Sequence, residues 1–163
     1  MNLSAKDQQD FEKILHQYQA LLWKVARAYC SNLEDQKDLI QEIALQLWRA
    51  YPKYNPKFAI TTWMYRIALN VAISNLRKQK RRTEAQLPEY PPPEEGEEVQ
   101  EQLDFLYQLI QQLPPLDKAL ILLYLEEVPQ QEIAEIMGIS LSNVSTRINR
   151  IKQKLKKLTN KWT

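Results

Sequence analysis

Residues 131–150, QEIAEIMGISLSNVSTRINR, decide the fold class of this chain. The apolar residues of the first part recur on one helical face: Ile133, Ala134 and Met137. Gly138 follows directly as a turn residue, and Ile139 is expected to insert into the core. Ser140 is placed to cap a second helix. Two short helices joined by a turn of this length predict a helix-turn-helix unit.

The second helix of this unit has one apolar face and one polar face. Apolar residues recur at steps of four and three: Val144, Ile148, Ile151, Leu155 and Leu158. At about 100° per residue, the opposite face carries polar and cationic residues: Ser142, Thr146, Asn149, Arg150 and Gln153. Short polar groups near a helix N-terminus, with cations beside them, are typical of a helix that reads DNA bases. The alternative is an ordinary solvated face.

Upstream, residues 1–82 predict three more helices. The first is expected from Phe11 to near Cys30, the second from its cap at Asn32 to Pro52, and the third over residues 61–82. Aromatic and apolar residues cluster near the start of the third helix: Tyr54, Phe58, Trp63, Met64 and Tyr65. Aromatic rings beside the basic run at 77–82 are suited to hold unpaired bases, with core packing as the alternative for Trp63 and Tyr65.

Charge divides the chain into blocks. Residues 1–82 carry 14 Lys or Arg against 7 Asp or Glu, while residues 83–103 carry 7 acids and no cation. Residues 104–139 have one Lys and six acids, and residues 140–163 have seven cations and no acid. Four of the nine prolines fall within 83–102, which predicts an acidic linker between two modules. A helix is expected again from Leu103, followed by a break at Pro114 and Pro115. A further helix is expected over residues 116–125, with Pro115 near its start.

Composition supports an all-α fold with two small helical domains. The chain has 163 residues and two glycines, too few for the turns of a β fold or for a Gly-rich phosphate loop. One cysteine excludes an intramolecular disulfide and a Cys-rich metal site. No apolar run approaches the length of a membrane span, so we expect a cytoplasmic protein without membrane insertion.

Five strings, in this order and spacing, resemble a bacterial sigma factor of the sigma-70 family, specifically the small extracytoplasmic-function type. They are DLIQE at 38–42, TWMYRIA at 62–68 with Asn70, RKQKRR at 77–82, EIA at 132–134, and MGIS at 137–140 with Val144, Arg147 and Arg150. The resemblance implies region 2 at residues 1–82, the linker at 83–102, and region 4 at 103–163. It covers nearly the whole chain.

The resemblance also implies a function and its residues. A sigma factor binds core RNA polymerase, directs it to promoters and has no active site or cofactor of its own. Contact with the clamp helices of the largest polymerase subunit would fall on Asp38, Leu39, Gln41 and Glu42. Recognition and melting of the minus-10 element would fall on Asn55, Phe58, Trp63, Asn70, Ser74, Asn75, Arg77, Lys78 and Arg81. Recognition of the minus-35 element would fall on Ser142, Asn143, Ser145, Thr146, Arg147, Asn149 and Arg150. An anti-sigma partner is implied by analogy.

Two other hypotheses stay open at this point. A helix-turn-helix regulator that never meets polymerase would explain the last two helices but has no need for residues 38–42. A helical enzyme could use the carboxylates of Glu126, Glu127, Glu132 and Glu135, although exposed surface acids explain them more simply. One departure from the family concerns DNA reading: Ser145 stands where the family usually has Lys after the Val of the recognition helix.

Overall fold

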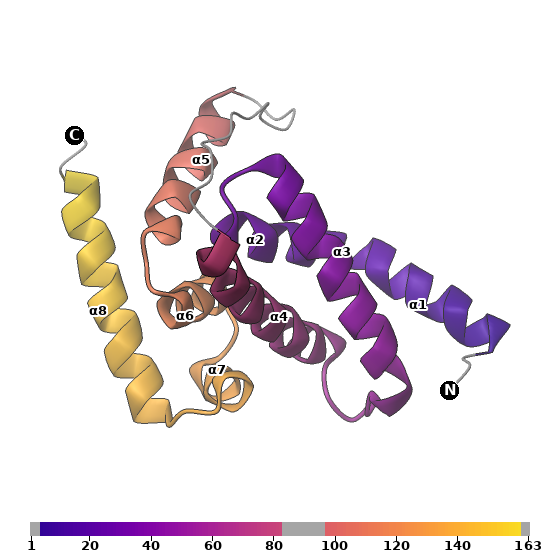
Figure 1. Ribbon diagram of the computed structural model, residues 1–163. Helices are drawn as coiled ribbons and strands as arrows, with labels where there is room; N and C mark the ends of the chain where they lie inside the picture. Colours follow the sequence, from indigo (N-terminus) through magenta and orange to yellow (C-terminus); the bar gives the residue numbers. More distant parts are fainter. Residues whose placement is uncertain (1–3, 83–96, 161–163) are drawn as a thin grey trace.

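The computed structural model describes residues 4–82 and 97–160, with side chains over 4–76 and 99–159, and this part of the chain is helical (Figure 1). The α-helices are α1 (Ala5–Gln17), α2 (Gln19–Tyr29), α3 (Leu33–Ala50), α4 (Ile60–Arg82), α5 (Glu97–Gln111), α6 (Pro115–Leu125), α7 (Gln130–Met137) and α8 (Leu141–Asn160). A short 3-10 helix, η1 (Tyr51–Lys53), follows α3. The described residues contain no strand, so the predicted all-α fold is confirmed.

The single helix predicted from Phe11 to near Cys30 is wrong, because the chain forms two helices with a break at Tyr18. The first begins earlier than predicted, where the Asp7 N–H donates to Ser4 Oγ at 3.1 Å and the Asp7 carboxylate accepts in return. Tyr18 leaves helical geometry at φ −110° and ψ 20°. Helix α1 buries only Phe11, whereas α2 buries six residues, so a bend lets α2 enter the core while α1 stays at the surface.

The remaining helix ends of the first half follow the predicted signals. Asn32 Oδ1 accepts from the Asp35 N–H at 2.7 Å and caps α3. Helix α3 stops at Ala50, and Pro52 lies in the short η1 turn that follows. Helix α4 then runs for 23 residues through the middle of the molecule, with α2 and α3 packed against it. These three helices form the body of the first half.

The second half consists of α5 to α8. Residues 97–102, expected in the linker, belong to the start of α5. Pro115 begins α6, as predicted, because proline is tolerated in the first turn of a helix. Gly138 has φ 68° and ψ 33°, the left-handed conformation that ends α7 and that side chains other than glycine adopt at a cost. The Asn143 N–H donates to Ser140 Oγ at 3.1 Å, so the predicted cap of α8 is confirmed.

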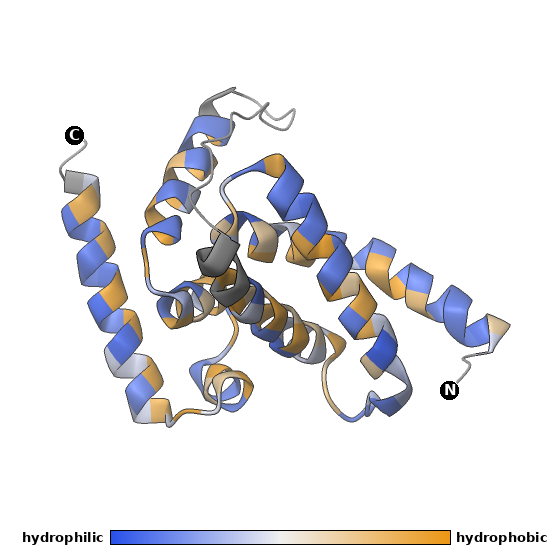
Figure 2. Ribbon diagram, viewed as in Figure 1, coloured by the Kyte–Doolittle hydropathy of each residue, from blue (hydrophilic) through white to orange (hydrophobic). Residues whose placement is uncertain are grey.

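The two halves share one hydrophobic core. Helix α6 lies between α2 and α4 on one side and α8 on the other, and residues 118–123 are all buried. A helix that is apolar all round is typical of such a central position. Hydrophobic faces of neighbouring helices turn toward one another in both halves (Figure 2). The core is continuous from Phe11 in α1 to Ile151 in α8.

Candidate nucleic-acid interface

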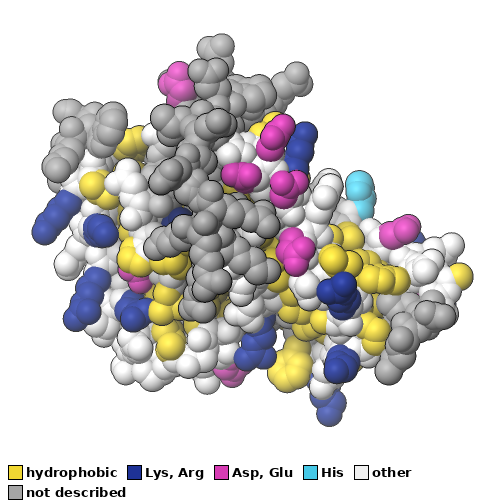
Figure 3. Space-filling view, in the orientation of Figure 1, with side chains coloured by type: hydrophobic (Ala, Val, Ile, Leu, Met, Phe, Trp, Pro, Cys, Tyr) yellow, Lys and Arg dark blue, Asp and Glu magenta, His cyan; other side chains and the backbone are white. Residues whose placement is uncertain are grey.

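The outer face of α8 is exposed along its N-terminal half. Val144, Ile148 and Ile151 are at most 3% exposed and hold the helix against α6 and α7. Five of the predicted DNA-facing residues are exposed: Ser142, Asn143, Thr146, Asn149 and Arg150. Lys and Arg side chains line the same side of the molecule (Figure 3). The predicted division of α8 into a buried stripe and a polar outer face is confirmed.

Ser145 differs from the other residues of this face because its hydroxyl has a partner inside the protein. Ser145 Oγ donates to Gln130 Oε1 at the start of α7, and the residue is half-buried. The bond links the two helices of the helix-turn-helix unit. Ser145 therefore helps to set the angle between α7 and α8, a role that the sequence pattern did not indicate.

A small cleft lies between α6 and α8 beside this face. Its volume is about 200 Å³, and it is lined by Asp117, Arg147, Arg150, Ile151 and Lys154. Arg147 is half-buried here, whereas Arg150 is exposed. Three cations against one carboxylate give this edge of α8 the positive potential that a phosphate backbone requires.

The loop before α4 and the first turns of α4 form a second exposed surface. Phe58 is 60% exposed, a high value for a large apolar side chain. Tyr54 Oη donates to the Phe58 carbonyl oxygen at 2.7 Å, and Asn55 Oδ1 accepts from the Lys57 N–H at 3.0 Å. These bonds hold the loop in shape around Phe58. The loop therefore presents an aromatic ring to solvent on a fixed backbone.

Trp63 lies in an aromatic cluster behind this loop. Its ring centroid is 5.0 Å from that of Tyr54 and 6.4 Å from that of Tyr51, and the side chain is half-buried. Tyr65 and Met64 are in the core, at 4% and 0% exposure. The core-packing alternative therefore holds for Tyr65, whereas Trp63 keeps a partly exposed edge. Of this group, Phe58 is the exposed aromatic residue.

Further along α4, Asn70 and Ser74 are exposed and Asn75 is half-buried. The side chains of Arg77, Lys78 and Arg81, predicted to contact DNA, lie outside the described residues, although their backbone continues α4. Asn70 and Ser74 are one helical turn apart and share a face. Polar residues thus extend the candidate surface along α4 toward the basic run.

The candidate polymerase-binding face lies on α3. Asp38, Gln41 and Glu42 are exposed, and acidic side chains gather over the N-terminal half of this helix (Figure 3). Leu39 is 1% exposed and packs in the core, so its assignment as a contact residue is corrected to a packing role. Leu45, which the sequence prediction did not include, is 42% exposed on α3, one turn after Gln41. Its only signal in the sequence was an apolar residue outside the buried stripe of the helix.

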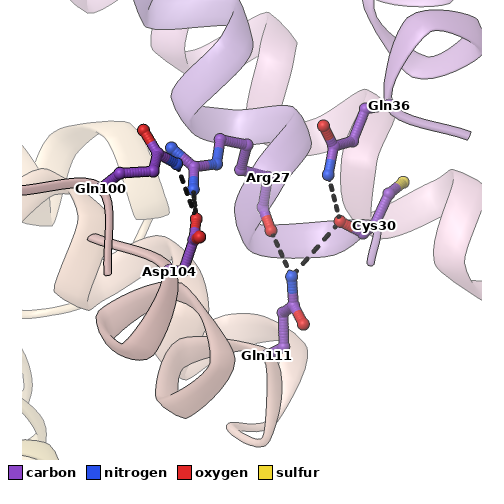
Figure 4. Close-up of polar contacts among 6 residues, drawn as sticks. All are labelled: Arg27, Cys30, Gln36, Gln100, Asp104 and Gln111. Carbon is purple, nitrogen blue, oxygen red and sulfur yellow. Dashed lines mark hydrogen bonds and ion pairs between the residues drawn. The ribbon is translucent and has the colours of Figure 1, made fainter. Parts of the chain in front are cut away.

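Polar contacts join α5 to the end of α2 (Figure 4). Arg27 Nη2 donates to Asp104 Oδ1 at 2.8 Å, and the Arg27 guanidinium lies 4.3 Å from the centroid of the Tyr107 ring. Gln111 Nε2 donates to the carbonyl oxygens of Arg27 and Cys30 at 2.8 and 3.4 Å. Gln36 Nε2 also donates to the Cys30 carbonyl, at 3.0 Å. The free carbonyls at the end of α2 are thereby satisfied by both halves of the protein.

The carboxylates considered for an enzyme do not form a metal site. Over residues 4–82 and 97–160, no group of three or more His, Cys, Asp and Glu side chains is placed to hold a metal ion. His16 is exposed on α1. Cys30 is buried, and burial together with the nearby Asp35 carboxylate raises the pKa of its thiol to about 12. A thiol so rarely ionised at neutral pH is chemically inert and structural.

Comparisons with known proteins agree with this arrangement. The family model "Sigma-70 region 2" matches residues 14–82, and "Sigma-70, region 4" matches residues 105–155. "RNA polymerase sigma factor SigV" of Bacillus subtilis is 33% identical and covers 78% of each chain. "ECF RNA polymerase sigma factor SigW" of the same organism is 28% identical over 93% of this chain and 89% of its own.

A solved structure shows the same fold. The sigma factor RpoE in complex with the anti-sigma factor NepR from Bartonella quintana aligns with a TM-score of 0.76 at 18% identity, over 93% of this chain and 98% of that one. Helices of both halves are included in this overlap.

The chain belongs to the extracytoplasmic-function branch of the bacterial sigma-70 family. It is a transcription initiation factor. The hypothesis of a regulator that acts without polymerase is therefore set aside. Within the part of the chain that the structure describes, no helix is long and apolar enough to cross a membrane.

Proposed function

We propose that residues 1–82 and 103–163 divide the work of promoter recognition, joined by the acidic segment 83–102. The first half binds core RNA polymerase and the minus-10 element, and the second half reads the minus-35 element. The observation that carries this division is the presence of two exposed surfaces on separate halves, the loop and start of α4 and the outer face of α8. The ranges of the two family matches support the same boundaries.

Core polymerase binds through the exposed face of α3. Asp38, Gln41 and Glu42 supply the polar contacts, and Leu45 adds an apolar one. Charge-bearing groups around an apolar residue are a common composition for a protein interface. Leu39 acts indirectly, because it anchors α3 in the core and so holds the outer residues in place.

Minus-10 recognition uses the aromatic loop and α4. Phe58 stacks on an unpaired base, and stacking of this kind contributes about 1 to 3 kcal/mol per base. Asn55 and Trp63 lie beside it, the first on the same loop and the second in the aromatic cluster behind. Asn70, Ser74 and Asn75 continue along α4 toward Arg77, Lys78 and Arg81, whose cationic side chains pair with phosphates.

Minus-35 recognition uses α8 as the major-groove helix. Five exposed residues face the bases and the phosphates: Ser142, Asn143, Thr146, Asn149 and Arg150. Arg147 contributes a phosphate contact from the cleft edge. Ser145, already bonded to Gln130, supports the helix angle rather than supplying the cation found at this position in the family.

The protein has no catalytic activity of its own and works in the cytoplasm with the polymerase. An anti-sigma factor is proposed as a further partner, because the similar structure of RpoE was solved with the anti-sigma factor NepR. Such a partner would control access to the surfaces on α3, α4 and α8. No metal or cofactor is needed for binding to DNA or to polymerase.

Co-elution with bacterial core RNA polymerase on gel filtration tests the assignment of α3. Wild type is expected to co-elute, and the double variant Gln41→Ala, Glu42→Ala is expected to lose binding. The control is Gln9→Ala, Glu12→Ala, which removes the same two residue types from the exposed face of α1. Equal binding by all three proteins would contradict the assignment of α3, and no binding by wild type would contradict the proposed function.

A further inference from the structure

We propose that Gln130 is a further DNA-binding residue of the second half, and that its carboxamide donates a hydrogen bond to a backbone phosphate of the minus-35 element. Ser145 holds the carboxamide in the orientation that this contact needs. The inference rests on the proposed function, because it adds one contact to the surface that reads the minus-35 element. The pair supplies a neutral contact in place of a cationic one, since Ser145 stands where the family usually has Lys.

The position of Gln130 places it beside the DNA backbone. It is the first residue of α7, the helix that precedes α8 in the helix-turn-helix unit. In proteins that bind DNA through this unit, the second helix enters the major groove and the first helix crosses the backbone. Gln130 is half-buried, and both of its neighbours, Pro129 and Gln131, are exposed. The start of α7 is therefore open to a ligand beside α8.

The hydrogen bond with Ser145 determines which end of the carboxamide is free. Ser145 Oγ donates to Gln130 Oε1, so the carbonyl oxygen of the side chain is directed to α8. The amide nitrogen, Nε2, carries two hydrogens and acts as a donor. Over residues 4–76 and 99–159, no side chain or backbone group accepts a hydrogen bond from this nitrogen. A donor held in one orientation beside the DNA backbone fits a phosphate oxygen.

The flank of α8 that carries Ser145 differs in charge from the opposite flank. Arg147 and Arg150 lie on the opposite flank, where they line the cleft between α6 and α8. On the Ser145 flank the first cation is Lys152, about two helical turns further along, and its Nζ lies 4.1 Å from the centroid of the Tyr124 ring in α6. Helix α7 itself contains no Lys or Arg. A phosphate on the Ser145 side of the groove therefore meets a neutral donor.

A neutral donor has a distinct effect on salt dependence. A Lys or Arg that neutralises one phosphate changes the slope of log affinity against log salt by about 0.9, because a counterion is released. A carboxamide binds the phosphate without neutralising its charge, so the counterion stays. The contact of Gln130 is therefore expected to increase affinity equally at every salt concentration. This property distinguishes it from the cationic contacts of Arg147 and Arg150.

Promoter binding by the full chain in complex with core RNA polymerase tests the contact. The probe is the duplex DNA that the wild-type complex selects from a random library, and fluorescence anisotropy over a salt series gives both the affinity and the slope. Gln130→Ala is expected to lose about tenfold in affinity, the effect of one hydrogen bond to a charged group. The slope should equal that of wild type.

Gln130→Glu separates the DNA contact from the link between the helices. The new carboxylate keeps an oxygen that accepts from Ser145 Oγ, but it has no amide hydrogen and its charge repels a phosphate. The melting temperature should stay close to that of wild type, while promoter affinity should fall by at least as much as in Gln130→Ala. The matched control is Gln131→Glu, which places the same charge on the next, exposed residue of α7 and should weaken binding much less.

Ser145→Lys tests the exchange of a neutral contact for a charged one. In the Gln130→Ala background, it is expected to restore most of the lost affinity at low salt and to make the slope steeper by about 0.9. An unchanged slope would contradict the placement of this flank beside a phosphate.

The outcomes separate this inference from the proposed function. Wild type that binds core polymerase and promoter, with Gln130→Glu binding as tightly as Gln131→Glu, overturns the DNA contact alone. A loss of affinity in Gln130→Ala that comes with a lower melting temperature and is absent in Gln130→Glu also overturns it, because Gln130 then acts only in helix packing. Wild type that never binds core polymerase overturns the proposed function and this inference together.

Discussion

The start of α4 and the outer face of α8 are both proposed to bind promoter DNA, but they differ in how closely the rest of the protein packs around them. Thr62 and Arg66 on α4 donate hydrogen bonds to α7. Thr146 and Asn149 on α8 are exposed. A surface that must hold melted bases needs aromatic residues supported by packing, so it lies close to the core. A surface that enters the major groove must project from the body of the protein.

The difference follows from how the second half packs. Helices α6 and α7 lie against α4, whereas α8 has α6 between it and the first half. Phe58 and Asn70 of the first surface nevertheless remain exposed.

The contrast between the two surfaces depends on the two halves sharing one hydrophobic core. Ile148 is 1% exposed behind the DNA-facing side of α8, and Ile148→Ala is expected to lower the free energy of unfolding by about 2 to 5 kcal/mol. Because the core is continuous, thermal unfolding followed by circular dichroism should show one transition at a lower temperature. Two separate transitions would contradict this. Thr146→Ala on the exposed face of the same helix is the control and should change stability by less than about 0.5 kcal/mol.

A variant that lacks one aromatic ring of the first surface tests that surface separately from the second. Phe58→Ala should reduce promoter melting by about 5- to 150-fold, the equivalent of roughly 1 to 3 kcal/mol of base stacking. Because Phe58 is 60% exposed, the melting temperature of the protein should stay close to that of wild type. Permanganate reactivity of thymines in the melted region measures the effect. Normal melting by the variant would exclude Phe58 from the minus-10 surface, and Leu141→Ala, also exposed, serves as the control.

A smaller effect is expected when one cation is removed from the second surface. Arg150→Ala should weaken binding of duplex DNA that carries the minus-35 element by about tenfold at moderate salt. It should also reduce the slope of log affinity against log salt by about 0.9, the value for one lost phosphate contact. Fluorescence anisotropy over a salt series gives both numbers. An unchanged slope would indicate that Arg150 faces a base or solvent instead of a phosphate.

The smallest expected effect concerns Cys30 at the junction of the halves. Its thiol is neutral in the folded protein up to about pH 12 but ionises near pH 9 when unfolded, so its contribution to stability is complete below pH 9 and is lost as the pH rises toward 12. Between pH 8 and 10.5, denaturant unfolding should show that the free energy of unfolding falls less with rising pH in Cys30→Ala than in wild type. At pH 8, the native thiol should react with a disulfide reagent far more slowly than the denatured thiol does. Equal reaction rates would contradict its burial.

Much of the fold was predictable from local patterns. The cap at Asn32, the start of α6 at Pro115 and the turn at Gly138 each depend on residues within a few positions, and all three were confirmed. The break at Tyr18 was not predicted, because the apolar residues on both sides of it continue the same helical spacing. The backbone turns there for a reason of packing, since α2 enters the core and α1 does not.

The candidate surfaces were predictable to a lesser degree. Periodicity separated the exposed face of α8 from its buried stripe, because both faces belong to one regular helix. It also placed Leu39 in the buried stripe of α3, and the assignment of Leu39 to the polymerase contact came from the family resemblance alone. Periodicity did not show that Ser145 would form a hydrogen bond with Gln130. A family pattern identifies a segment as an interface, whereas the side chains that reach the surface depend on what packs behind them.

The sequence by itself determined most of the helices, the helix-turn-helix unit, the family and the division of the chain into basic and acidic blocks. These properties follow from residue type and from spacings of three and four residues. Only the tertiary structure decided that Glu132 meets Thr62 and that Glu126 meets Lys24, pairs separated by 70 and 102 positions in the chain. Such contacts depend on how whole helices pack, and no local spacing encodes which turn of α4 lies beneath α7.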